Sequence, residues 1–260
     1  MASIQDELEE AGSEFAEAPV RKIAPSKDGA LAFIERTSAS LLDLVASFSG
    51  DKKLHRIAVW DVDEDGSQRI VAIVSQSDVI ALMHRHVADL QLGSVPVADV
   101  VPLAPDSVLT VAGTVTAIEA FELMAHNQRS AVGITAEPGG ALIANLSASD
   151  MRNLGAPSSW AALALPVAQF VVQTNGITGL PPPTLNDVPG VPRVYAGSVI
   201  DGDAKYVALV TVNTEDSSLE TVLCAMVENC VHHVYVVDHG IGRPQGVVTP
   251  FDILRWVSES

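Results

Sequence analysis

One pattern occurs three times in this chain of 260 residues: an apolar run leads into Ser or Thr, and Asp follows three positions later. The copies are "IVSQSDVI", "ANLSASDM" and "VVTPFDIL". Such a spacing is typical of the first turn of a helix, where the hydroxyl caps a backbone N–H group and the carboxylate faces the positive end of the helix dipole. Because the pattern returns together with its surroundings, it predicts an internal repeat.

The segments upstream of each motif also match. Strands are predicted for "LHRIAVWD", "RSAVGIT" and "VHHVYVVD", because β-branched and apolar residues are bounded there by turn residues. Helices are predicted further upstream for "SASLLDLVASF", "TAIEAFELMAH" and "DSSLETVLCAMVEN", and strands before them for "ALAFIER", "VLTVAG" and "VALVTVN". The order strand, helix, strand, strand, helix predicts a mixed α/β (α+β) fold made of three repeats.

Each repeat begins with a similar opener, "PVRKI", "PVADV" or "PVAQF". The predicted organisation is an acidic N-terminal segment at 1–18, repeat 1 at 19–90, repeat 2 at 91–158 and repeat 3 at 159–260. The Pro-rich sequence "LPPPTLNDVPGVP" suits neither a helix nor a central strand, so about 172–204 is predicted to be an insertion or linker on the surface.

The N-terminal segment carries a stripe of apolar residues on an otherwise acidic helix, namely Ile4, Leu8, Ala11 and Phe15. This spacing predicts an amphipathic helix that docks either on the protein's own core or on a partner.

The formal charge of −17, from 15 basic and 32 acidic residues, argues against a surface for nucleic acid or anionic membrane. A small phosphorylated ligand is still compatible, because it needs only a few local cations and backbone N–H groups. No apolar run reaches the ~18 residues of a membrane span, and the N-terminus is acidic where a signal peptide is basic. We therefore expect a cytoplasmic protein, with the nucleus also possible.

Catalytic and metal-binding motifs are not found in the sequence. There is no nucleophile elbow, Walker loop, HExxH or GxGxxG. Cys224 and Cys230 have neither a metal spacing nor a disulfide framework, and His84 and His86 in "MHRH" have no Cys or acid that completes a zinc site. The expectation is a non-catalytic protein without a metal or a cofactor.

The repeated segments resemble CBS domains, the β-α-β-β-α repeats that pair into Bateman modules. The likeness rests on "HRIAVWD", "SQSDVIALMHRH", "LSASDMRNL" and "VHHVYVVD" with "GVVTPFDIL", and it covers the chain from about residue 19. Within that family the chain is most similar to the γ-type regulatory subunits of AMP-activated, or sucrose-non-fermenting, kinases and to their plant γ-like relatives. The resemblance implies repeats packed in pairs, with the adenine nucleotides AMP, ADP or ATP bound between them.

The resemblance also implies roles for single residues. The motif carboxylates would accept hydrogen bonds from ribose, the motif hydroxyls would donate to the ligand, and basic residues at the start of the second strand would reach the phosphates. The implied set is Asp78, Asp150, Asp252, Ser75, Ser147, Thr249, His55, Arg56, Arg129, His232 and His233. His55 and Arg56 match the family's His-Arg pair, whereas His233 stands where Arg is usual and Arg129 is followed by Ser130.

Two functions remain open at this point. The first is a sensor of adenine nucleotides that regulates a protein kinase in a γ-subunit-like role. Its partner would be a catalytic or scaffold subunit of that kinase. The second is a scaffold for protein–protein contact that has lost its ligand, which the acidic charge and the substituted basic positions favour. A third possibility, the regulatory domain of an enzyme or transporter, requires a separate partner chain.

Three repeats also raise the question of pairing. Repeats 1 and 2 are expected to form one module. Repeat 3 would then pair with a degenerate remnant around 160–205, with a copy of itself in a homodimer, or with a missing fourth repeat.

Overall fold

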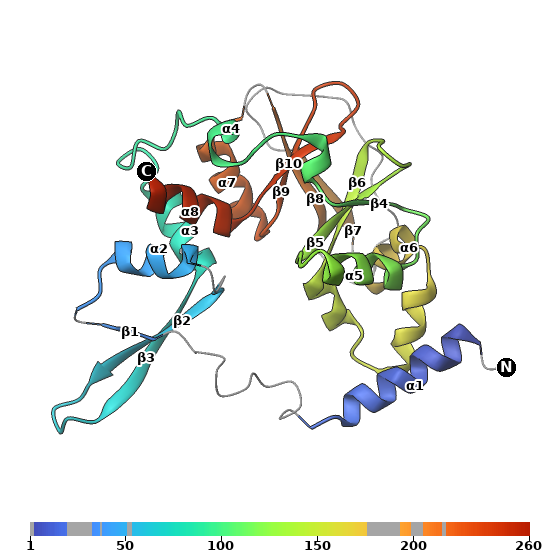
Figure 1. Ribbon diagram of the computed structural model, residues 1–260, viewed down its shortest axis with the longest axis horizontal. Coiled ribbons are helices and arrows are strands. Elements are labelled where there is room, and N and C mark those ends of the chain that lie inside the picture. The colour runs from blue at the N-terminus through green and yellow to red at the C-terminus, as the bar shows by residue number, and fades with distance from the viewer. Residues whose placement is uncertain are drawn as a thin grey trace. The chain divides into compact units, whose positions relative to one another are not determined.

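The computed structural model of the protein describes residues 3–19, 33–36, 38–50, 54–175, 193–198, 205–214 and 217–260 (Figure 1). The chain forms two compact bodies. Body I comprises Met1–Ala24, Leu103–Asp216 and Tyr235–Val247, and body II comprises Pro25–Pro102, Ser217–Val234 and Val248–Ser260. Each body is described by itself below.

Repeat 1 has the predicted order of elements. They are β1 (Phe33–Glu35), α2 (Leu41–Ser49), β2 (Arg56–Val62), β3 (Gln68–Ser75) and α3 (Gln76–Arg85). The sheet order is β1-β2-β3, with β1 parallel and β3 antiparallel to β2. The opener "PVRKI" of this repeat lies outside the described residues, except for its Pro.

Repeat 2 follows the same order, with one difference at its end. Its elements are β4 (Thr110–Ala112), α5 (Ala117–His126), β5 (Ala131–Thr135), β6 (Leu142–Ser147) and the 3-10 helix η3 (Ala148–Asn153). The sheet order β4-β5-β6 repeats that of repeat 1. A full α-helix does not form after Ser147, because "MRNLGAP" lacks the apolar spacing of the other two copies and soon brings Gly and Pro.

Repeat 3 is formed by β8 (Lys205–Asn213), α7 (Leu219–Asn229), β9 (Val234–Val237), β10 (Pro244–Val248) and α8 (Pro250–Glu259). Its sheet has a fourth strand, β7 (Arg193–Ser198), which is antiparallel to β8 and gives the order β10-β9-β8-β7. This strand lies within the segment, about 172–204, that was predicted to be an insertion or linker on the surface. Arg193–Ser198 form an edge strand there, which the sequence did not predict, and 176–192 lie outside the described residues.

Among the described residues, body I also contains the helical elements α1 (Ile4–Glu17), η4 (Pro157–Ala164) and α6 (Val167–Thr174), besides a short 3-10 turn before β4. The predicted amphipathic helix at the N-terminus forms and packs on η4 through Leu8, Gly12 and Phe15, whose ring centroid lies 5.4 Å from that of Trp160. Gly12 permits close contact, since a Cβ there would lie 2.7 Å from Cγ of Trp160. Ile4 stays exposed, so α1 docks on the protein's own body with part of its stripe uncovered.

The centre of body II is a group of four helices. In Figure 1, α2 lies beside α8, and α3 beside α7 and α8. Apolar residues at helical spacing are buried between them, including Phe48, Met83, Leu223 and Leu254, each at most 4 % exposed. Full burial of one such side chain contributes about 1.5–3 kcal/mol. The helices of repeat 1 are thereby held against those of repeat 3.

Body I holds the contact between the sheets of repeats 2 and 3. Leu142 of β6 is buried with Leu209, Tyr235 and Val237 of repeat 3. The Tyr235 hydroxyl donates a hydrogen bond of 2.7 Å to Oδ1 of Asn145, and burial raises the pKa of Tyr235. Repeats 1 and 2 were expected to pack on each other. Instead, within body I the sheet of repeat 2 packs on that of repeat 3, and within body II the helices of repeat 1 pack on those of repeat 3.

The openers of repeats 2 and 3 each attach to the other repeat. In body II, Pro96 bridges to Ser218, the N-cap of α7, and in body I, Pro166 bridges to Thr116, the N-cap of α5. Backbone hydrogen bonds seal both contacts, such as Leu219 N–H to Val95 O at 2.8 Å and Val167 N–H to Val115 O at 2.7 Å. Short helical turns, α4 (Val97–Val100) and α6, follow these bridges, and η2 (Pro105–Ser107) leads into β4.

Candidate functional site

All three Ser/Thr-x-x-Asp motifs begin helices, as the sequence predicts. The Ser75 N–H and Oγ donate to Oδ2 of Asp78 at 2.8 and 2.7 Å, and the Thr249 N–H and Oγ1 donate to Oδ2 of Asp252 at 2.9 and 2.6 Å. In repeat 2 the Ser147 N–H donates to Oδ2 of Asp150 at 2.7 Å. These bonds satisfy backbone groups that a helix start leaves unpaired.

The same geometry leaves one carboxylate oxygen outside each capping box. In Asp78, Asp150 and Asp252 the bonds from the cap residue end on Oδ2, and Oδ1 takes no part in the box. An ionised carboxylate offers about four lone-pair sites. Capping and acceptance of a ribose hydroxyl are therefore chemically compatible in one Asp.

Repeat 1 brings its basic residue next to this box. Arg56 opens β2 and lies directly opposite Ser75 across the antiparallel pair, while the Gln76 N–H donates to the carbonyl of His55 at 3.2 Å. The Ser75 hydroxyl and backbone hydrogen bonds lower the pKa of Asp78, and the Arg56 guanidinium lowers it further. His55, Arg56 and Asp78 are all exposed. The result is an accessible carboxylate, a cation and a helix N-terminus in one place.

Repeat 2 has no basic residue at the corresponding position. Here Ala131 lies opposite Ser147, and the Ala148 N–H donates to the carbonyl of Ser130 at 2.8 Å. Ala131 therefore corresponds to Arg56 and Ser130 to His55. By this register Arg129 lies one position before the counterpart of His55, and its contact with a phosphate stays a prediction. Burial raises the pKa of Asp150, which is 9 % exposed.

In repeat 3, strand register identifies His233 as the counterpart of Arg56. Val237 pairs with Asn213 and accepts from the Thr214 N–H, as Trp60 pairs with Glu35 and accepts from the Arg36 N–H. Counting back four residues from each gives His233 and Arg56. Burial of the imidazole and the neighbouring His232 lower the pKa of His233 to about 4. The side chain is therefore neutral at pH 7 and brings no charge.

The structure links the sites of repeats 1 and 3 through a contact that the sequence did not predict. Ser77, in the first turn of α3, has its Oγ 2.9 Å from Nε2 of the exposed His232. Both residues lie in body II, as do the motif residues of repeats 1 and 3. Those of repeat 2, Ser147, Asp150 and Arg129, lie in body I. Only the position of Ser77 between the two motif residues could have marked it in the sequence.

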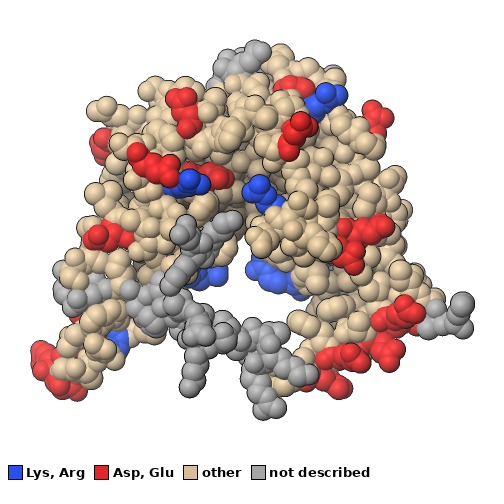
Figure 2. All heavy atoms as spheres, viewed as in Figure 1, with Lys and Arg blue, Asp and Glu red and all other residues tan. Residues whose placement is uncertain are grey.

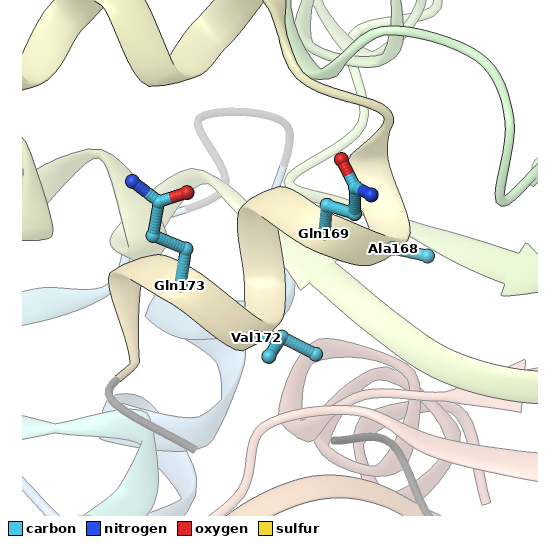
Figure 3. Close-up of a pocket in the computed structure, with 4 residues that line it drawn as sticks. All are labelled: Ala168, Gln169, Val172 and Gln173. Atoms are coloured by element: carbon cyan, nitrogen blue, oxygen red, sulfur yellow. The ribbon is translucent and has the colours of Figure 1, made fainter. Parts of the chain in front are cut away.

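Two hollows are lined by other residues. The first, about 530 Å³, is lined by Ala168, Gln169, Val172 and Gln173 on α6, and Figure 3 shows both Gln side chains on the same side of the helix. The second, about 470 Å³, lies at the β2–β3 hairpin beside Trp60 and Ile70. None of the described residues that line either of these two hollows belongs to a motif.

Within the described part of the chain, no group of three or more His, Cys, Asp or Glu side chains could hold a metal ion. His86, from the "MHRH" sequence, instead has Nδ1 3.2 Å from Oδ2 of Asp89. No helix in the described ranges is long and apolar enough to cross a membrane.

Comparison with known sequences extends this description. Residues 199–259, which contain β8, α7, β9, β10 and α8, match the sequence profile of the CBS domain. This part of the third repeat is therefore similar in sequence to a CBS domain. The profile covers less than half of the chain, and the other two repeats share its order of strands and helices. Comparison with curated proteins gave no match.

Solved structures support the fold of the whole chain. A protein of Methanocaldococcus jannaschii, proposed to be an archaeal homologue of γ-AMPK, has a TM-score of 0.59 at 14% identity over 92% of this chain and 70% of its own. An uncharacterised conserved protein of Pyrococcus horikoshii has a TM-score of 0.58 at 13% identity over 92% of this chain and 83% of its own. The described chain therefore has the mixed α+β fold of tandem CBS repeats.

Proposed function

We propose that the protein is a non-catalytic regulatory module that binds an adenine nucleotide at the N-terminus of α3. One observation carries the proposal: Arg56 lies opposite Ser75 in the sheet, beside the exposed carboxylate of Asp78. A helix N-terminus and a guanidinium attract phosphate, and a carboxylate accepts from ribose hydroxyls. His55 would add a further donor on the phosphate side.

Repeat 3 would contribute to the same site through His232, which contacts Ser77. A ligand held there would touch two repeats of body II and would favour the packing of α3 against α7 that best accommodates it. A partner that prefers this packing would respond to the ligand by linkage, without catalysis in this chain. The likeness in fold to an archaeal protein proposed to be a homologue of γ-AMPK makes a protein kinase the first partner to test.

Calorimetric titration with AMP, ADP and ATP tests the nucleotide part. Asp78→Ala is expected to remove binding while costing about 1 kcal/mol of stability, as loss of a cap does. Asp43→Ala is the matched control, because Asp43 accepts the same bonds from Ser40 at the start of α2, at 2.7 and 2.6 Å. This control should lose its cap and keep nucleotide binding. Absence of heat and of a thermal shift with all three nucleotides at millimolar concentration would refute the proposal.

The kinase part requires a separate measurement. Purified protein, immobilised with and without nucleotide, should retain a catalytic or scaffold subunit of an AMP-activated type kinase and change its activity. Failure here with intact nucleotide binding would leave a nucleotide-binding module that acts on another class of partner.

A second candidate function is a scaffold that keeps the architecture without a ligand. It is favoured by Ala131 and the neutral His233, which occupy the positions of Arg56 in the other two repeats. A scaffold would show no nucleotide response in the wild type, and Asp78→Ala would change only its stability.

A further inference from the structure

One face of the repeat 1 sheet carries apolar side chains that water reaches. Ala58 pairs with Ile73 and Trp60 with Ile70 across β2 and β3, so these four residues share one face. Ile70 is 59% exposed and Ile73 is 64% exposed. We call this surface, made of Ala58, Trp60, Ile70 and Ile73, the repeat 1 sheet face. Contiguous exposed apolar residues of this kind usually mark a contact surface.

Corresponding positions in the other repeats are buried. By strand register, Leu142 corresponds to Ile70, while Tyr235 and Val237 correspond to Ala58 and Trp60. All three are 2% exposed, because the sheets of repeats 2 and 3 pack on each other in body I. This chain therefore already contains two such faces that cover one another, and the repeat 1 sheet face is a third of the same kind.

We propose that the repeat 1 sheet face binds the same face of a second copy of the chain, in a symmetric dimer. A twofold contact between identical surfaces requires each surface to be complementary to itself. The face meets this requirement in size, because the bulky pair Trp60–Ile70 of one copy can lie over the smaller pair Ala58–Ile73 of the other when the strands run in opposite directions. Facing large against small side chains is how packed layers interdigitate.

Charge selects the same orientation. Glu64 and Asp65 are exposed at the turn between β2 and β3, where acidic residues gather in Figure 2, and His55 and Arg56 are exposed at the opposite end of the hairpin. Opposed strands place the acidic turn of each copy over the basic end of the other. In the contact of repeats 2 and 3 the two turns instead lie together, joined by the Arg243 Nε–H to Gly139 O bond of 2.7 Å. That arrangement in a dimer would bring two acidic turns together, which costs energy.

The first test is the oligomeric state, measured by light scattering after size exclusion from about 1 to about 100 µM. A dimer is expected, and Ile70→Glu and Ile73→Glu should each weaken self-association at least tenfold, because they bury a charge in the contact. Ile241→Glu is the control, since Ile241 is 52% exposed in the β9–β10 turn. A wild-type monomer throughout, or a dimer that tolerates both substitutions, would overturn the proposal.

The second test fixes the orientation. The Ile70→Cys and Ile73→Cys variants are made in a Cys230→Ser background, which removes the exposed thiol. Each variant is oxidised alone, and an equimolar mixture of the two reduced variants is oxidised in parallel. Opposed strands predict that the mixture forms the disulfide faster than either variant alone, since the bond needs Cα atoms within about 7 Å. Faster self-linking of Ile70→Cys would overturn the orientation. Unfolding curves of the free variants establish that the exposed substitutions leave each monomer folded.

Discussion

Asp78 and Asp150 occupy the same place in two copies of one motif, yet their surroundings differ. Asp78 is exposed, has a lowered pKa, lies beside Arg56 and begins a ten-residue α-helix. Asp150 is nearly buried, has a raised pKa, has Ala131 across the strand pair from its cap residue and begins a six-residue 3-10 helix. The motif begins a helix in both repeats. The residue that pairs with the cap residue differs, and only Arg56 in repeat 1, unlike Ala131 in repeat 2, offers a positive charge to a phosphate.

The largest expected effect concerns that cation. Arg56→Ala should weaken nucleotide binding about tenfold to a hundredfold, because charge-assisted hydrogen bonds are worth about 1.5–3 kcal/mol. Arg129→Ala should change affinity less than about twofold, since Arg129 lies one position away from the equivalent of His55. Isothermal titration calorimetry of both variants measures the contrast.

Arg69→Ala is the matched control within the same sheet. Arg69 is exposed and paired with Asp63 at 2.9 Å, away from the cap. Equal losses for Arg56→Ala and Arg69→Ala would mean that general positive charge, and not the position opposite Ser75, attracts the ligand.

A smaller effect should follow pH through His233. Its pKa of about 4 lies below the value of the unfolded chain, about 6.5, so the unfolded state binds the extra proton. The stability from this histidine is fully present above about pH 6.5 and is lost as the pH falls toward about 4. Urea unfolding at about pH 7, 6 and 5 should show a steeper loss for the wild type than for His233→Gln. Parallel curves, or an NMR titration of His233 near its ordinary pKa, would contradict this.

The smallest expected effect is a difference in folding stability between substitutions of Asp78 and of Asp150. Asp78→Asn should destabilise the protein by about 1 kcal/mol at neutral pH, because the cap and the dipole both favour the charged form. Asp150→Asn should be neutral or stabilising there, since its raised pKa means that the charged form is disfavoured in the folded state and the penalty appears as the pH rises. Thermal unfolding of the two variants measures the difference, and equal losses would show that burial of Asp150 costs nothing.

The sequence predicted the elements well because they depend on neighbours along the chain. Capping at Ser75, Ser147 and Thr249, apolar spacing in α7 and the strand order all follow from local rules. The edge strand β7 was missed, because its pairing with β8 depends on a partner and not on its own Pro-rich surroundings.

The site was predicted less completely, and the reason is register. A shift of one residue moves a side chain to the other face of a strand, and motif matching alone does not fix it. By register, Ser130 rather than Arg129 is the counterpart of His55. The contact of Ser77 with His232 joins residues 155 positions apart, which no local pattern indicates.

The exchanged openers make repeats 2 and 3 inseparable as building blocks. Pro96 precedes repeat 2 in sequence but completes the start of α7, and Pro166 precedes repeat 3 but completes the start of α5. If the chain were cut between the two repeats, the fragment with repeat 2 would keep Pro96 and lose Pro166, which pairs with the start of α5. The fragment with repeat 3 would keep Pro166 and lose Pro96, which pairs with the start of α7. The smallest portion of this chain that can be expressed or exchanged without loss of these contacts is therefore larger than a single sequence repeat.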